Sequence, residues 1–136
     1  MAEPSPVSLS LTWEGDLRFR CDAQGRGMLL DGNSLAGVSP VEALGFALAA
    51  CMGSDVVHIL GKQRARLRAC AIRFTGRRAD ADPRRLVAVE THFALQGDVG
   101  PDRVERAIAL SRGKYCSVWF SMRQDIEFTT SYSIGD

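Results

Sequence analysis

Residues 39–60 read SPVEALGFALAACMGSDVVHIL, and the rest of the 136-residue chain can be arranged around them. The stretch opens with a strong helix start, because Ser39 suits the N-cap, Pro40 the first helical position and Glu42 the carboxylate of a capping box. Residues 43–53 then carry no charge on any side of the helix. A helix that is apolar all round is buried all round, so we predict a central helix whose burial a second subunit would complete.

Length, composition and charge are those of one ordinary globular domain, which we place over residues 1–136. The net charge is +1 and the arginines are scattered without interleaved aromatic residues, so we expect no nucleic-acid partner. Residues 1–6 are polar with two prolines and predict neither a signal peptide nor an anchor. The uncharged run 43–53 is too short to span a bilayer. We therefore expect a cytoplasmic protein with no membrane partner.

Apolar and polar residues alternate in several short segments, and this alternation predicts strands. The central helix is expected to end near Arg64, where basic residues favour the negative end of the helix dipole. The order of three strands, helix, two strands, one or two helices and a last strand predicts an α+β fold with helices against mostly antiparallel sheet. The segments are strands at 7–13, 17–21, 28–30, 70–77, 87–96 and 126–134, and helices at 101–112 and about 115–122.

The chain has four widely spaced cysteines and no close pair, so in a reducing compartment they begin as free thiols. Cys21 and Cys70 fall on the apolar faces of predicted strands, where a thiol is usually a small core hydrophobe. Cys116 follows Arg112 and Lys114 at a predicted helix start. Cations and exposed N–H groups both lower a thiol pKa, so Cys116 is a candidate reactive thiol.

Cys51 lies in an apolar setting, which raises the pKa of a thiol and keeps it inert unless a cation reaches it. Arg18 and Arg20, together on one face of a predicted strand, are candidates for that cation. Two interpretations stay open on local pattern alone: Cys51 and Cys116 form a redox thiol pair, or all four cysteines are packed side chains.

A metal site has little support in the sequence. Cys51, Asp55 and His58 share one face of the central helix. The chain has no CxxC or HxxxH spacing, and Asp55 and His58 can satisfy each other or a neighbouring strand. We therefore predict no metal and no cofactor.

Three motifs resemble the OsmC/Ohr family, the osmotically induced protein C and organic hydroperoxide resistance proteins of bacteria. The resemblance covers nearly the whole chain and is closest to the less characterised OsmC-like branch. The motifs are SPVEAL at 39–44 running into AAC at 49–51, SRGKYCSV at 111–118 and TSYSI at 130–134.

The resemblance implies an intertwined homodimer with two antiparallel-rich sheets around long central helices. It also implies a stress-response peroxidase chemistry. Cys51 would attack an organic hydroperoxide as a thiolate and become a sulfenic acid, and Cys116 would resolve it as a disulfide that a dithiol then reduces.

In this family an arginine and a glutamate assist the reactive thiolate. The glutamate position falls on Val41, and the chain has Glu42 one place later. Nine residues turn an ideal helix by about 180°, so Glu42 points away from Cys51 and a capping role suits it better. Arg18 or Arg20 is the candidate for the arginine.

Three functions are therefore open. The first is a thiol-dependent peroxidase for organic hydroperoxides. The second is a non-catalytic module that binds a small hydrophobic or electrophilic ligand around Cys51. The third is a redox sensor that forms the same disulfide and passes the signal on. Val41 favours the second or third function, and the retained Cys51 and Cys116 favour the first.

Overall fold

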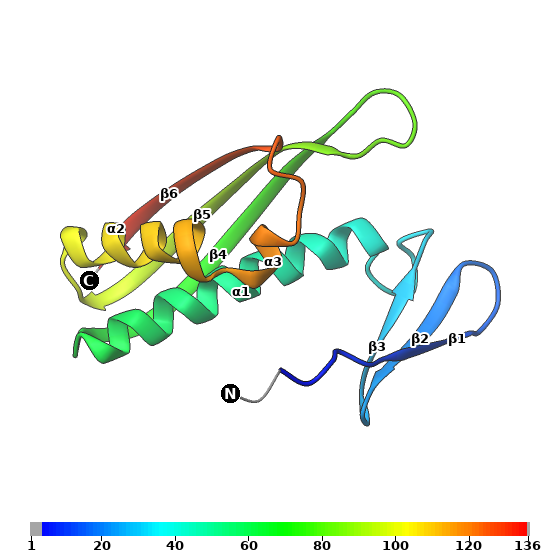
Figure 1. Cartoon of the computed structure of the whole chain (residues 1–136), viewed down its shortest axis with the longest axis horizontal. Coiled ribbons are helices and arrows are strands. Elements are labelled where there is room, and N and C mark those ends of the chain that lie inside the picture. The colour runs from blue at the N-terminus through cyan, green and yellow to red at the C-terminus, as the bar shows by residue number, and fades with distance from the viewer. Residues whose placement is uncertain (1–3, 136) are drawn as a thin grey trace. The chain divides into compact units, whose positions relative to one another are not determined.

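The structure is a computed structural model that describes residues 4–135. The chain divides into two compact units, Met1–Leu44 and Gly45–Asp136. The element order places three strands before a long helix and a second three-stranded sheet after it (Figure 1).

The first unit contains a three-stranded antiparallel meander, as predicted. Its strands are β1 (Ser10–Trp13), β2 (Arg18–Ala23) and β3 (Arg26–Asp31), and β2 lies in the middle. Tight turns join the strands, because Gly15 and Gly25 adopt the left-handed backbone that glycine tolerates best. The first strand was predicted over residues 7–13 and half-buried, and both its length and its burial were overestimated. The observed β1 has four residues, all exposed.

Helix α1 (Pro40–Lys62) begins where the sequence predicts and ends two residues before the expected end. The backbone N–H of Glu42 donates to Ser39 Oγ at 3.1 Å, and the backbone N–H of Ser39 donates to Glu42 Oε1 at 2.9 Å. These two bonds form the predicted capping box. By length and composition α1 could also cross a membrane, which residues 43–53 alone could not, but a core helix outside a membrane meets the same two criteria.

Only one stripe of α1 is buried within a single chain. It follows helical spacing and consists of Gly45, Leu48, Met52, Gly53, Val56 and Leu60. A second stripe faces outward, and its largest side chain, Phe46, is 64% exposed. A single chain therefore buries the helix only in part, because one sheet has only one face to offer it, and completion of the burial by a second subunit stays a prediction.

The second unit is built on a sheet of order β4-β5-β6, from β4 (Arg66–Arg78), β5 (Leu86–Asp98) and β6 (Glu127–Gly135). Strands β4 and β5 are antiparallel, whereas β5 and β6 run parallel. A chain that returns through helices can enter beside β5 in the parallel sense. The fold is α+β with two sheets and helices, as predicted.

Three short helical segments connect β5 to β6. They are α2 (Pro101–Leu110), a π-helix (Ser111–Tyr115) and α3 (Ser117–Phe120). Helix α2 buries Val104, Ala107 and Ile108 at the spacing that the sequence predicts. Figure 1 shows α2 along the sheet, with the π-helix leading back towards α1.

Two glycines let α1 approach β4 closely. A Cβ atom on Gly45 would lie 2.8 Å from the Phe74 ring, and one on Gly53 would lie 2.5 Å from Ile72 Cδ1. Gly61, by contrast, has no heavy atom within 4 Å of its Cβ position. The close contact with β4 therefore depends on Gly45 and Gly53.

We expect Gly45→Ala to lower the free energy of unfolding and Gly61→Ala to raise it. Both gain up to about 1 kcal/mol of helix propensity, but only Gly45→Ala adds an overpacking cost of about 1–3 kcal/mol against Phe74. Urea unfolding of the two variants measures the difference. Equal stability of the pair would contradict the close contact of α1 with β4.

Candidate active site

Cys51 lies in the middle of α1, beside the buried stripe, and its side chain is half-buried. Its Sγ atom lies 3.7 Å from Ser117 Oγ, and the backbone N–H of Val118 also donates to it. Both partners belong to α3. The start of that short helix therefore presents its free N–H and hydroxyl groups to the Cys51 sulfur.

The π-helix sets the position of Cys116. The backbone N–H of Cys116 donates to the carbonyl oxygen of Ser111, five residues earlier, at 2.8 Å. Cys116 is then the N-cap of α3, and its Sγ accepts from the backbone N–H of Trp119 at 3.4 Å. The side chain is fully buried. The predicted helix start at Cys116 is confirmed.

Asp55 brings a carboxylate to the two sulfurs. It follows Cys51 by one helical turn, and its Oδ2 accepts from Ser111 Oγ at 2.7 Å. Ser111 itself is fully buried. One ligand atom from each of Cys51, Asp55 and Cys116 lies within 4.8 Å of the others. The fold thus joins α1 to the segment after α2 at a cluster of two thiols and one carboxylate.

The two thiols have opposite pKa shifts. Burial and, to a smaller extent, the Asp55 charge raise the pKa of Cys51, but hydrogen bonds from Val118, Ser117 and the Cys116 thiol outweigh them, so its pKa lies below the ordinary value. Burial raises the pKa of Cys116 to about 11, and its hydrogen bond to Cys51 acts in the same direction. Cys51 is therefore the more acidic of the two thiols, and Cys116 holds its proton to higher pH.

These directions reverse both sequence predictions for the thiols. The expected cations do not act on Cys116. The Arg112 guanidinium lies over the Phe128 ring, 4.8 Å from its centroid, and the Lys114 ammonium lies over Tyr115 at 5.2 Å. The hydrogen bonds that lower the pKa of Cys51 come from a segment far away in the sequence, so local composition could not reveal them.

The predicted helper residues have partners of their own within the first unit. Arg18 forms an ion pair with Asp16 at 2.9 Å, and Arg20 one with Glu14 at 3.3 Å. Glu42 is engaged in the capping box and also accepts from Ser34 Oγ at 3.2 Å. The roles of Arg18, Arg20 and Glu42 in activating Cys51 stay predictions.

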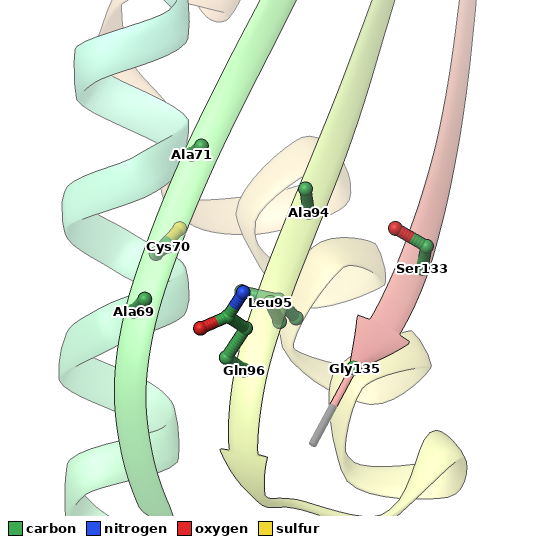
Figure 2. A pocket seen from close by; sticks show the side chains of 8 residues that line it. All are labelled: Ala69, Cys70, Ala71, Ala94, Leu95, Gln96, Ser133 and Gly135. Carbon is green, nitrogen blue, oxygen red and sulfur yellow. The ribbon is translucent and has the colours of Figure 1, made fainter.

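The other two cysteines lie outside this cluster. Cys21 is half-buried on β2, and its Sγ lies 3.8 Å from the carbonyl oxygen of Phe19. Cys70 is half-buried on β4, where burial raises its pKa. It lines a hollow of about 260 Å³ among mostly small residues of β4, β5 and β6 (Figure 2). Its position suits a control residue.

In the sequence Asp55 follows Cys51 by four residues, and the prediction was that its carboxylate would pair with His58 or with a neighbouring strand. The structure gives Asp55 to Ser111 and the two sulfurs, and His58 is exposed. Ser111 is a polar residue at a core position of the amphipathic α2 pattern. That mismatch was the available signal.

Comparisons with known proteins identify the family and the fold of this chain. The family model "OsmC-like protein" matches residues 31–131. Protein YhfA of Escherichia coli K12 is 36% identical over 125 residues, which cover 90% of this chain and 93% of YhfA. A hypothetical protein from Aquifex aeolicus has a similar structure, with a TM-score of 0.90, 24% identity and coverage of 97% and 98% of the two chains.

A structure from Legionella pneumophila, described as an organic hydroperoxide resistance protein OsmC and predicted redox protein, has a TM-score of 0.72. It is 15% identical, and the match covers 97% of this chain and 99% of that one. At this identity the likeness concerns the fold alone. The family model and the YhfA relationship extend over most of the sequence, and on that basis the chain belongs to the OsmC-like protein family.

Proposed function

We propose that the protein is a thiol-dependent peroxidase that reduces organic hydroperoxides, with Cys51 as the attacking thiol and Cys116 as the resolving thiol. The observation that carries this proposal is the approach of the two sulfur atoms to within 4.8 Å, from elements far apart in the chain. The choice of substrate rests on the chain's membership of the OsmC-like family and on the motifs that resemble the organic hydroperoxide resistance proteins.

In the first step, the Cys51 thiolate attacks the terminal oxygen of the hydroperoxide and the O–O bond breaks. The sulfur becomes a sulfenic acid, and the alkoxide leaves and takes a proton to become the alcohol. Hydrogen bonds from Val118 and Ser117 lower the pKa of the Cys51 sulfur and so favour the thiolate that attacks. Residues 43–53 around Cys51 carry no charge, and such apolar surroundings suit the organic group of a hydroperoxide.

In the second step, the Cys116 sulfur attacks the Cys51 sulfenic acid. A disulfide forms, and the hydroxyl group leaves as water with the proton that Cys116 held. A raised pKa suits this order of events, because Cys116 stays protonated while Cys51 reacts first. A dithiol reductant would then return both cysteines to thiols.

Glu42 serves in this proposal as a helix cap, and Arg18 or Arg20 would supply the cation beside Cys51 that the family resemblance implies. We also propose that the two units act as one cytoplasmic OsmC-like domain, since the family model runs through their boundary at Leu44.

The exposed stripe of α1 supports a homodimer. Phe46, Ala50, Ser54 and Val57 follow one another along this stripe and all are exposed. A large apolar side chain in such a stripe is typical of a surface that another chain covers. An intertwined homodimer, as in the family resemblance, would complete the burial of the central helix.

Single-turnover oxidation tests the peroxidase proposal. One equivalent of cumene hydroperoxide should remove two thiols per reduced chain and give a Cys51–Cys116 disulfide in peptide mapping. Cys51→Ser should lose none, and Cys116→Ser should stop at a sulfenic acid that dimedone traps. Cys70→Ser is the control and should behave as wild type. Reaction of Cys51 no faster than free glutathione would refute the enzyme and leave a binding module or a sensor.

The pH dependence of alkylation tests the assignment of the two thiols. Thiolate forms above the pKa, so a lowered pKa moves the rise in iodoacetamide reactivity of Cys51 to lower pH than that of an ordinary thiol. Cys116 should react only as the pH approaches about 11. Mass spectrometry of each peptide, with a chelator present, measures both curves. Labelling of Cys116 at lower pH than Cys51 would reverse the proposed roles of the two thiols.

Light scattering after size exclusion tests the dimer. The wild type should have twice the 14.8 kDa mass of one chain, and Phe46→Asp should shift it towards one chain. In a two-fold dimer the substitution removes Phe46 from both subunits, which costs about 3–6 kcal/mol of buried apolar contact in total. Ala71→Asp, on the sheet face in Figure 2, should remain dimeric. A folded Phe46→Asp dimer would exclude this stripe as the interface.

A further inference from the structure

The peroxidase chemistry leaves one group of the cluster without a task. The Asp55 carboxylate lies beside both sulfurs, with one ligand atom of each of the three residues within 4.8 Å of the others. A neighbouring carboxylate thus opposes the thiolate that attack on a peroxide needs. The same charge favours a cation bound between the three groups.

The geometry suits a small cation with thiolate ligands. Zinc binds cysteine sulfur at about 2.3 Å and carboxylate oxygen at about 2.0–2.2 Å, so its tetrahedral ligand atoms lie about 3.5–3.8 Å apart. The three ligand atoms of Cys51, Asp55 and Cys116 already lie within 4.8 Å of one another. Side-chain rotations that move the ligand atoms together by about 1 Å would therefore close the site, with the helices left where they are.

Neighbouring groups already orient the three ligands. Ser111 Oγ donates to Asp55 Oδ2 at 2.7 Å, which leaves the other carboxylate oxygen for a metal. The Trp119 N–H donates to the Cys116 sulfur, and the Val118 N–H donates to the Cys51 sulfur. Partners of this kind fix ligand orientation in metal sites, and they hold these side chains before any ion arrives.

We propose that the reduced Cys51–Cys116 pair and Asp55 bind a divalent cation of the zinc class, with a fourth position open to water or a small ligand. Two thiols release their protons to solvent on binding, and the three anionic ligands face a charge of +2. Magnesium and calcium prefer oxygen ligands, so two sulfurs select against them. The sequence contains no zinc spacing because the second thiol comes from another element.

Metal binding and peroxide reduction would exclude each other. The bound cation occupies the sulfur lone pair with which Cys51 attacks oxygen, and the Cys51–Cys116 disulfide has no thiolate to offer. The cation site rests on the cluster itself and stands even if the protein is not a peroxidase.

Cobalt(II) titration of the reduced full-length protein without oxygen tests the site. We expect one cobalt per chain, with near-ultraviolet thiolate-to-cobalt charge transfer and the intense visible bands of tetrahedral cobalt, and displacement of both by zinc. Cys51→Ser and Cys116→Ser should lose the charge-transfer intensity. Loss of a residue that only hydrogen-bonds to a metal ligand weakens metal affinity by about tenfold or more. Asp55 is proposed as a ligand itself, so Asp55→Asn should weaken cobalt affinity by at least about tenfold.

Cys70→Ser and Cys21→Ser are the matched controls and should bind cobalt as the wild type does. Far-ultraviolet circular dichroism checks that each variant is folded. Absence of the charge-transfer band in the wild type, or an unchanged band in folded Cys51→Ser, would overturn the proposal. Unchanged affinity in folded Asp55→Asn would also overturn it. Turnover with cumene hydroperoxide in a chelator is measured separately, so failure of the peroxidase and failure of the metal site give different results.

Discussion

Ser111 links the two parts of the thiol cluster through its two oxygen atoms. Its hydroxyl donates to Asp55 on α1, and its carbonyl oxygen accepts the backbone N–H of Cys116. Because Ser111 is fully buried, water does not compete for either bond. The backbone and the side chain of this one residue therefore help to set the separation of the two sulfurs, although the residue carries neither of them.

The direction of α1 depends on a different kind of contact. Gly45 and Gly53 remove the side chains that would push the helix away from β4, and the capping box fixes its first turn. These features place Cys51 at a set distance from the sheet. The position of the helix therefore depends on the missing side chains of Gly45 and Gly53 as well as on the apolar side chains of the buried stripe.

Much of this fold could be predicted from the sequence, because its signals are local. The capping box, the apolar stripe of α2 and the alternation in β4 each lie within a few neighbouring residues. The parallel pairing of β5 with β6 depends on the path of the whole chain and is not written in either strand. Burial also misled locally, since apolar β1 residues that suggested a half-buried strand are exposed in one chain.

The site was predictable in its cysteines but not in its electrostatics. The pair Cys51 and Cys116 follows from motifs, whereas their pKa directions follow from hydrogen bonds across the fold. Arg112 is close to Cys116 in sequence, yet its charge lies over the Phe128 ring. Neighbours along the chain are thus poor guides to the field at a sulfur atom.

The π-helix has a consequence for how the chain could have changed over time. A π-turn holds one residue more than an α-turn, and removing a residue from 111–115 would restore ordinary α-helical bonding. A complete turn of either kind returns the chain to nearly the same side of the helix, so Cys116 would keep its direction towards Cys51. The number of residues between the two cysteines could thus change by one codon without separating the thiols. What the site requires of this segment is a complete turn, and not a fixed count of residues within it.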